Sequence, residues 1–363
     1  MSTKSLIFGD KVLLVIVLLL SLFSFFPVFS SSSYLSYVID GASPIYYLVK
    51  HLIVILFGFI LMLSIKLVPF KFFRGMSIIL LPIGIGLLVY TLSQGTIIGG
   101  SAASRWIDIP FVGISFQTSA LAAIIIITYT ARYLSKVELS KTKFSETLIP
   151  LWLPIFTYIF LIFPANFSSA FLIFTALVIT LFISGFPLRH LFKVFLILVF
   201  LLITFFFTAK TFPDKFPNRI DTWLSRIENF GSNKNLDASY QIERAKMAIN
   251  NGGLIGVGAG KSIMKNHLPQ SNSDFIFAII VEEWGSIGGA FIICLYILMF
   301  FRFLSITHRI DDRFGKILVS GLGVFIIIQA FTNISVATQI IPVTGQNLPL
   351  ISSGGSSAWM TCI

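Results

Sequence analysis

The sequence has 363 residues, of which 56% are hydrophobic and only 11% are charged. A soluble domain usually carries about a quarter charged residues, so this composition excludes an ordinary soluble protein and indicates a chain built in a lipid bilayer. The net charge of +11 follows the pattern of basic loops expected from membrane orientation, and we therefore expect no nucleic-acid partner.

Apolar runs dominate the chain, and each is long enough or nearly long enough to cross a bilayer, which takes roughly 20 residues. Ten such runs are found, at 12–29, 46–65, 75–92, 111–131, 148–163, 168–186, 191–209, 275–301, 317–334 and 351–363. The sequence therefore predicts an all-α, polytopic membrane protein that forms one membrane domain over residues 1–363. Because the last run stops at Ile363, we expect that its helix and a tail continue further.

The distribution of lysine and arginine predicts the orientation of these helices. Most of the 26 basic residues lie in the N-terminal segment and in every second short loop, whereas the other short loops carry only Lys50 and Arg105. Short loops rich in basic residues face the cytoplasm. We therefore expect a cytoplasmic N-terminus and one large extracytoplasmic loop at 210–274.

The large loop has two stretches with helical spacing of apolar residues. Residues 221–230 are predicted to form an amphipathic helix on the membrane surface. Residues 239–250 are predicted to form a second helix, with Ser239 as a possible N-cap and Gly252 and Gly253 at its C-terminal end. A loop of this length usually carries function.

The glycine-rich stretch 256–262 is similar to a phosphate-binding loop at first sight. A nucleotide-binding loop needs a glycine where this chain has Ile255, so we exclude a nucleotide site. Glycines still allow backbone N–H groups to approach an anion closely. We expect such an anion near Lys261.

Three carboxylates lie at the start of the apolar run that follows the loop. Asp274 precedes this run, where it is an N-cap of a helix beginning at Phe275, an ordinary interfacial carboxylate or a functional group. Glu282 and Glu283 lie inside the run. For them we expect a structural role, bonding neighbouring helices or lining a cavity.

Several motifs together resemble the SEDS family of peptidoglycan polymerases. They are Leu-Pro-Gln-Ser-Asn-Ser-Asp-Phe-Ile-Phe-Ala at 268–278, Val-Glu-Glu-Trp-Gly at 281–285, Ser-Arg-Trp-Ile at 104–107 with Phe-Gln-Thr-Ser at 116–119, and the stretch 341–357 that ends in Gly-Gly-Ser-Ser. The resemblance spans about residues 10–363. The sequence Thr-Gly-Gln-Asn-Leu-Pro-Leu at 344–350 resembles the cell-division members of the family more than the cell-elongation members.

The chain departs from the family pattern at four positions. Ala120 and Ala123 replace an acid–lysine pair, and Gln270 and Asn272 replace a glutamate and a histidine near Asp274. The prolines and glycines of 341–357, with Gly354 and Gly355 at the end, predict an irregular backbone that leads into the last helix beside a cavity.

The resemblance implies transfer of a muramyl sugar from undecaprenyl pyrophosphate to a hydroxyl of a second lipid II, with inversion, at the outer face of the bacterial cytoplasmic membrane. Asp274 would be the general base. The expected binders of lipid II or its pyrophosphate are Lys261, Lys246, Arg244, Gln241, Arg219, Arg105, Ser356 and Ser357. A divalent cation is a possible cofactor, although the sequence contains no ligand cluster for one, and Cys294 and Cys362 indicate no metal site.

The family also implies partners and leaves alternatives. Expected partners are a class B penicillin-binding transpeptidase and other membrane proteins of the division machinery, at the division septum. Alternative functions are a lipid II flippase, an elongation-type polymerase, another polymerase or ligase of lipid-linked sugars, and a weakly active division scaffold. The replacements at Ala120 and Ala123 keep the last alternative open.

Overall fold

The structure is a computed structural model that describes residues 9–35, 43–94, 105–109, 114–138, 142–211, 236–268 and 271–363. Seven of the described helices are long and apolar enough to cross a membrane. The short apolar helix α8 (Phe167–Ile183) adds to these by composition. The predicted all-α membrane fold is confirmed.

The elements of the N-terminal half are α2 (Lys11–Leu35), α3 (Pro44–Lys66), α4 (Phe70–Gln94), β1 (Trp106–Ile109), β2 (Ile114–Gln117), α5 (Thr118–Lys136), α6 (Phe144–Thr147), the π-helical turn η2 (Leu148–Trp152), α7 (Leu153–Ile162), α8 and α9 (Leu188–Thr211). The elements of the C-terminal half are α11 (Leu236–Gly252), the 3₁₀ turn η4 (Met264–Asn266), α12 (Ile276–Arg309), α13 (Arg313–Ala337) and α14 (Gly355–Cys362). Each of the ten apolar runs contains most of one helix.

The fourth predicted helix was wrong at its start. Residues 106–109 and 114–117 form a two-stranded antiparallel hairpin, and α5 begins only at Thr118. β2 alternates apolar and polar residues, and both strands contain isoleucine with an aromatic residue, a composition that suits a β-ribbon better than a helix. The hairpin gives the segment before α5 a fixed conformation, which places Arg105.

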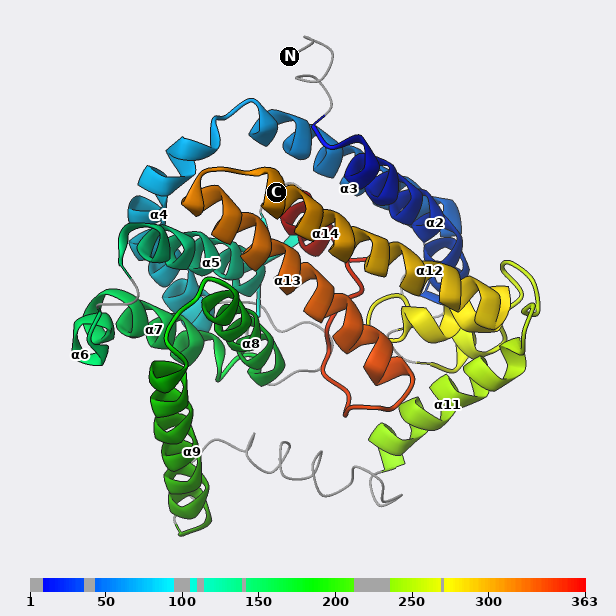
Figure 1. Ribbon diagram of the computed structural model, residues 1–363. Coiled ribbons are helices and arrows are strands. Elements are labelled where there is room, and N and C mark those ends of the chain that lie inside the picture. The colour runs from blue at the N-terminus through cyan, green and yellow to red at the C-terminus, as the bar shows by residue number, and fades with distance from the viewer. Residues whose placement is uncertain are drawn as a thin grey trace.

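Two clusters of buried apolar residues form the core of the bundle. One cluster joins α2, α11, α12, the C-terminal half of α13 and residues 348–351. The other joins α4, α5, α7, α8 and the N-terminal half of α13. Helix α13 therefore belongs to both cores, and α14 lies between α3, α5 and α13 near the middle of the bundle (Figure 1). Helix α9 extends away from the other helices (Figure 1).

Two ion pairs tie the helices together at one end of the bundle. Asp10 before α2 accepts from Arg302 of α12, with Nε 2.7 Å from Oδ1. Arg74 of α4 lies 2.7 Å from Asp312, the N-cap of α13. All four residues come from segments that the charge pattern assigns to the same side of the membrane.

Helix α12 is broken at Gly285, which has φ +68° inside the helix. The glycine-rich loop after α11 packs into this break. A Cβ at Gly252, Gly256 or Gly285 would lie only 1.9–2.2 Å from a backbone carbonyl oxygen of the opposite segment. Only glycine permits this approach. The packing fixes the path of the chain from α11 toward Asp274.

Candidate active site

Asp274 lies in a tight turn at the start of α12, and its exposed fraction is only 8%. The interpretation of Asp274 as an N-cap is wrong, because the N-cap of α12 is Phe275 and no side chain caps this end. The neighbouring backbone is held by the segment before α14. The Ser352 Oγ donates to the Ser273 carbonyl at 2.7 Å, and the Ser353 N–H donates to the Asn272 carbonyl at 2.9 Å.

Asn333 of α13 bonds to the backbone of Asp274. Its Nδ2 donates to the Asp274 carbonyl at 3.0 Å and to the Gln346 carbonyl at 2.7 Å. The Asn333 side chain is buried. One amide group therefore joins the turn at Asp274 to the irregular segment 341–350.

The Asp274 carboxylate and the Arg105 guanidinium both lie next to Gly345. A Cβ at this glycine would lie 3.6 Å from the Asp274 Oδ2 and 3.9 Å from the Arg105 Nη1. Gly345 has φ +69°, a conformation that favours glycine. A carboxylate and a guanidinium, 169 positions apart in the sequence, thus flank one small open position on the backbone.

Arg105 is fixed by the turn that leads into α8. Its Nε donates to the Ala165 carbonyl at 2.8 Å. The next residue, Asn166, caps α8 by accepting from the Ser169 N–H at 3.2 Å. The Ser169 hydroxyl accepts from the Gln346 Nε2 at 3.0 Å, which leads back to Asn333.

We call this group of residues the polar ring. Its members are Asp274, Asn333, Gln346, Ser169, Asn166 and Arg105. Hydrogen bonds join it from the Asp274 carbonyl to Asn166, Arg105 bonds the carbonyl of the preceding residue, Ala165, and Arg105 and Asp274 lie on either side of Gly345. Asp274 and Asn333 lie with one core, and Ser169, Asn166 and Arg105 lie with the other. The polar ring therefore lies at the seam between the two cores.

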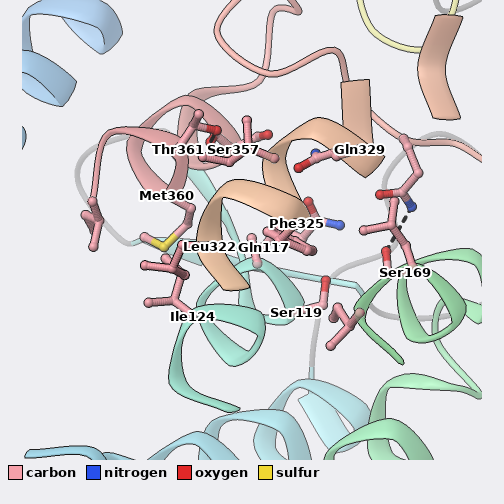
Figure 2. Close-up of a pocket in the computed structure, with 16 residues that line it drawn as sticks. Gln117, Ser119, Ile124, Ser169, Leu322, Phe325, Gln329, Ser357, Met360 and Thr361 are labelled. Carbon is pink, nitrogen blue, oxygen red and sulfur yellow. Dashed lines mark hydrogen bonds between the residues drawn. The ribbon is translucent and has the colours of Figure 1, made fainter. Parts of the chain in front are cut away.

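A cavity of about 60 Å³ opens beside the polar ring, between α5, α8, α13 and α14 (Figure 2). Its polar lining is neutral and consists of Gln117, Ser119, Ser169, Gln329, Gln346, Ser357 and Thr361. Ala120 also lines it, and Ala123 is fully buried nearby in α5. The two positions that carry the acid–lysine pair in the SEDS pattern thus leave this cavity without a charge.

The predicted residues of the Gly-Gly-Ser-Ser motif have different places. The Ser356 hydroxyl accepts from the Gln117 N–H at 3.1 Å and joins α14 to β2. Ser357 lines the cavity. Gly354 is the N-cap of α14, and a Cβ there would lie 2.5 Å from the Asn347 Nδ2, while Gly355 begins the helix.

Glu282 and Glu283 are buried under the glycine-rich loop and bond to it. The Glu282 carboxylate accepts from the Ser262 hydroxyl and from the N–H groups of Ile263 and Met264. The Glu283 carboxylate accepts from the hydroxyl of Ser30 in α2 and from the Ser262 N–H at 3.4 Å. Both carboxylates connect the loop to the helices rather than to Asp274.

The glycine-rich loop does not offer a free anion cradle. The N–H groups of Val257 and Gly258 donate to the carbonyl oxygens of Glu282 and Glu283, each at 3.0 Å. Lys261 is exposed, and its stem lies 3.3 Å from the Cβ position of Gly258. Lys265, in contrast, is held by this loop, because its Nζ donates to the Gly260 carbonyl at 2.7 Å.

Helix α11 confirms the second predicted loop helix, although it begins at Leu236, so Ser239 is inside it rather than at its cap. Arg244 lies against its own helix, with its guanidinium 4.8 Å from the Tyr240 ring centre. Lys246 is exposed and Gln241 is partly exposed. No contact among the described residues joins these three side chains to Asp274. Arg219 and the predicted helix at 221–230 lie outside the described residues.

The described residues contain no group of three histidine, cysteine, aspartate or glutamate side chains that could hold a metal ion. Sequence reasoning overlooked the contacts of Asn166, Ser169, Asn333 and Gln346. Asn333 gave a weak signal, because a polar residue inside an apolar helix requires a partner. Asn166 precedes an apolar run, which is the usual place of a helix N-cap, and its partner Ser169 is only three positions away. Ser169 and Gln346 gave no signal, because they lie 177 positions apart.

Comparison with known proteins adds a second line of observation. The sequence profile of a family described as cell cycle protein, FtsW/RodA/SpoVE, matches residues 10–363. A probable peptidoglycan glycosyltransferase FtsW of Hydrogenovibrio crunogenus is 31% identical over 325 residues, 88% of this chain and 80% of that protein. The protein of the same name from Idiomarina loihiensis is 31% identical over 353 residues, 96% of this chain and 83% of that protein.

Solved structures share the fold. A chain from a study of polymerization and crosslinking by a peptidoglycan synthase complex has a TM-score of 0.74 and 21% identity, over 97% of this chain and 94% of that chain. The rod shape determining protein RodA of Thermus thermophilus has a TM-score of 0.67 and 21% identity, over 97% of this chain and 93% of that chain.

Proposed function

The chain belongs to the FtsW/RodA/SpoVE family of cell cycle proteins, and from this premise we propose that it is a peptidoglycan glycosyltransferase of the division type. It polymerises lipid II into glycan strands at the outer face of the bacterial cytoplasmic membrane. The observation that carries the proposal is the meeting of the Asp274 carboxylate and the Arg105 guanidinium at Gly345. One group can take a proton, and the other can neutralise a leaving anion.

Asp274 acts as the general base. Its carboxylate takes the proton from the attacking sugar hydroxyl, whose oxygen forms a bond to the anomeric carbon of the donor as the bond to the pyrophosphate oxygen breaks. A positioned general base contributes about 10²–10⁴-fold to the rate. Attack from the face opposite the leaving group gives inversion without a covalent sugar–enzyme intermediate.

Arg105 neutralises the charge that develops on the pyrophosphate. The guanidinium is held by the Ala165 carbonyl, so it is in position before the substrate binds, and preorganised charge is the main electrostatic contribution to catalysis. Lys246, Lys261, Arg244 and Arg219 attract the anionic lipid to the outer surface, and the neutral Gln241 amide donates a hydrogen bond to it. Ser357 provides a neutral hydroxyl in the adjacent cavity, and Ser356 supports it through β2.

The proposed setting follows from the arrangement of charge. The ends of α2, α4, α12 and α13 that carry the two ion pairs face the cytoplasm, and the loop 210–274 faces outward at the septum. A class B penicillin-binding transpeptidase, together with other membrane proteins of the division machinery, works beside this chain. Such a partner would crosslink the strands that this chain polymerises.

The first prediction concerns Asp274. Asp274→Ala and Asp274→Asn abolish polymerisation of purified lipid II by the purified protein, because neither alanine nor an amide takes a proton from the attacking hydroxyl. The matched control is Asp311→Ala, which removes an exposed carboxylate far along the sequence between α12 and α13.

The outcomes separate the proposal from its alternatives. Strand synthesis by Asp274→Asn at the rate of the unchanged chain contradicts the general-base role. Movement of lipid II across vesicle bilayers by the unchanged chain, with no strand synthesis under any condition, indicates the flippase instead.

A further inference from the structure

The turn 272–274, which ends in Asp274, is held from outside by its three backbone carbonyl oxygens. In sequence order they accept from the Ser353 N–H at 2.9 Å, the Ser352 Oγ at 2.7 Å and the Asn333 Nδ2 at 3.0 Å. Two of these donors are side chains. The backbone that carries the Asp274 carboxylate therefore takes its position partly from α13 and partly from the segment before α14.

Helix α12 leaves the Asp274 carbonyl available for this contact. In a regular helix this oxygen would accept from the N–H four residues further on, which belongs to Ala278. The Ala278 N–H donates instead to the Phe275 carbonyl at 3.0 Å. The place of Asp274 thus depends on contacts across the fold and does not follow from the helix beside it.

The Asn333 amide connects both sides of the site. Its Nδ2 also donates to the Gln346 carbonyl at 2.7 Å, and Gln346 directly follows Gly345, next to which the Asp274 Oδ2 and the Arg105 Nη1 lie. The two N–H bonds of one planar amide point in fixed directions. They therefore set the distance between the backbone at Asp274 and the backbone at Gly345.

Ser352 connects the same turn to a strained stretch of backbone. Its hydroxyl accepts from the Leu348 N–H at 2.8 Å while it donates to the Ser273 carbonyl. Between these two ends lies Leu350, which is buried and has φ +65°. A side chain rarely adopts this conformation. Such strain persists only where surrounding contacts enforce it, and it is concentrated at functional sites.

Asn333 is costly to the fold in which it lies. Its exposed fraction is 1%, it lies inside an apolar helix, and its Oδ1 has no hydrogen-bond partner among the described residues. A buried unpaired acceptor lowers stability. Natural proteins tolerate such costs most often where a residue serves the active site.

We propose that Asn333 and Ser352 are positioning residues for the polymerisation reaction. They hold the backbone at Asp274 so that its carboxylate stays in place relative to Arg105 and takes the proton. Both side chains are buried, and neither lines the cavity of about 60 Å³ beside the polar ring, so they act through Asp274 and not on the substrate. The inference rests on the proposed function and deepens it.

Two substitutions remove these donors with little change of shape. Ser352→Ala removes one hydroxyl. Asn333→Leu removes the amide and keeps a side chain that branches at Cγ. The matched control is Ser24→Ala, because the buried Ser24 hydroxyl also makes two bonds, to the Ser21 carbonyl at 2.6 Å and to the His51 Nε2 at 2.7 Å. These partners belong to α2 and α3, outside the polar ring.

The experiment uses the full chain in nanodiscs and measures three quantities. They are the rate of lipid II polymerisation, the affinity and stoichiometry of lipid II binding, and the thermal unfolding midpoint. The stoichiometry counts the folded chains, so that kcat is expressed per chain that binds lipid II. Any general loss of folded protein is thereby separated from a loss of rate.

We expect kcat per binding chain to fall about ten- to a hundredfold in Ser352→Ala and Asn333→Leu, because a misplacement of about 1 Å at a reacting group costs on the order of 10²-fold in rate. The affinity for lipid II stays unchanged in both. Ser24→Ala lowers the unfolding midpoint about as much as Ser352→Ala, since each loses two hydrogen bonds, but keeps the kcat of the unchanged chain.

Three results overturn the inference. They are an unchanged kcat per binding chain in Ser352→Ala, an equal loss of kcat in Ser24→Ala, and a loss of lipid II affinity as large as the loss of rate, which would assign the side chains to substrate binding. If Asn333→Leu does not fold, Ser352→Ala decides alone.

The proposed function fails on a different measurement. Strand synthesis by Asp274→Ala means that the base is wrong. An inactive Asp274→Ala beside fully active Ser352→Ala and Asn333→Leu leaves the base in place and removes only the positioning role.

Discussion

The meeting of Asp274 and Arg105 depends on one residue without a side chain. Gly345 has φ +69°, and its missing Cβ leaves open the position next to the Asp274 Oδ2 and the Arg105 Nη1. A side chain there would occupy space between the base and the cation. It would also strain the backbone by about 1–2 kcal/mol.

We therefore predict that Gly345→Ala lowers the rate of lipid II polymerisation at least tenfold while the protein remains folded. The Cβ lies at van der Waals distance from both groups rather than in a clash, so the loss comes from blocked access and backbone strain. The check is a polymerisation assay beside a thermal unfolding curve. The control is Gly185→Ala, which has φ +82° but open space around it. Equal losses of activity in the two variants would contradict a role for the space at Gly345.

Sequence reasoning at the residue scale found Asp274 and Arg105 but not the residues between them. Asp274 stands out because a carboxylate before an apolar run is conspicuous. The contacts of Asn333 and Gln346 use backbone carbonyl oxygens, which every residue possesses. The sequence could therefore indicate that Asn333 needs a partner, but it could not identify which carbonyl oxygens that partner would provide.

The glycine-rich loop is an element whose position depends on close backbone contact. Gly256 has φ +92°, and a Cβ there would lie 2.2 Å from the Glu283 carbonyl oxygen. Gly260 has φ +75° but open space around it. Alanine at either position strains the backbone, and only alanine at 256 also clashes with α12.

We predict that Gly256→Ala separates the loop from the break in α12, whereas Gly260→Ala does not. The amides of Val257 and Gly258, which donate to α12, should exchange hydrogen faster in Gly256→Ala. Hydrogen exchange followed by mass spectrometry of peptides covering 253–264 measures this. Similar exchange in both variants would mean that backbone strain alone, and not the close approach, governs the loop.

Helix α13 begins at an N-cap that also forms an ion pair. The Asp312 carboxylate accepts from the Gly315 N–H at 3.0 Å and from Arg74. The Gly315 N–H, followed by Arg74, holds the pKa of Asp312 below its usual range. A carboxylate with a lowered pKa stabilises the fold above its unfolded pKa, near 3.9, and this stability is lost as the pH falls through the folded pKa.

We predict that Asp312→Asn lowers the free energy of unfolding by about 0.2–1 kcal/mol at pH 7, because it keeps a cap but loses the ion pair. Asp312→Ala should lose about 1 kcal/mol more, since it also loses the cap. The difference between Asp312→Asn and the unchanged chain should shrink below about pH 4. Chemical unfolding at several pH values measures this, with the exposed Asp311→Asn as control. A difference that is constant over this pH range would argue against the ion pair.

The helices themselves were the most predictable elements. Their lengths follow from the thickness of the bilayer. Nearly every predicted apolar run therefore corresponds to a helix whose ends differ from the prediction by a few residues. The β1–β2 hairpin was missed because its strands are only four residues long and β2 lies inside the apolar run 111–131, which was predicted to be a helix. The break at Gly285 was missed because a glycine inside an apolar run carries no sign of what packs against it.

At the scale of the whole molecule, the described part of the loop 210–274 leaves apolar side chains exposed. This part packs through α11 on α12, while Leu254, Ile255 and Ile263 remain largely exposed. Exposed apolar side chains outside the bundle are available to a lipid surface or to another protein. The proposed transpeptidase would cover part of this surface and order the approach to Asp274.

We predict that addition of the class B transpeptidase slows hydrogen exchange in peptides from 210–274 and raises the rate of polymerisation. Peptides from 302–316, at the opposite end of the bundle, serve as the internal control and should not change. If the isolated chain already shows full protection in 210–274 and its highest activity, activation by docking is ruled out.

The seam between the two cores separates the base from the cation. Asp274 lies directly before the N-cap of α12, and Arg105 is bonded to the turn before α8. A substitution that shifts one core against the other therefore changes their spacing without touching either residue. Damage of this kind has a genetic signature. A loss-of-function allele in one core can be rescued by a second-site suppressor in the other, and such suppressor pairs should lie across the seam along α13 rather than side by side within one core.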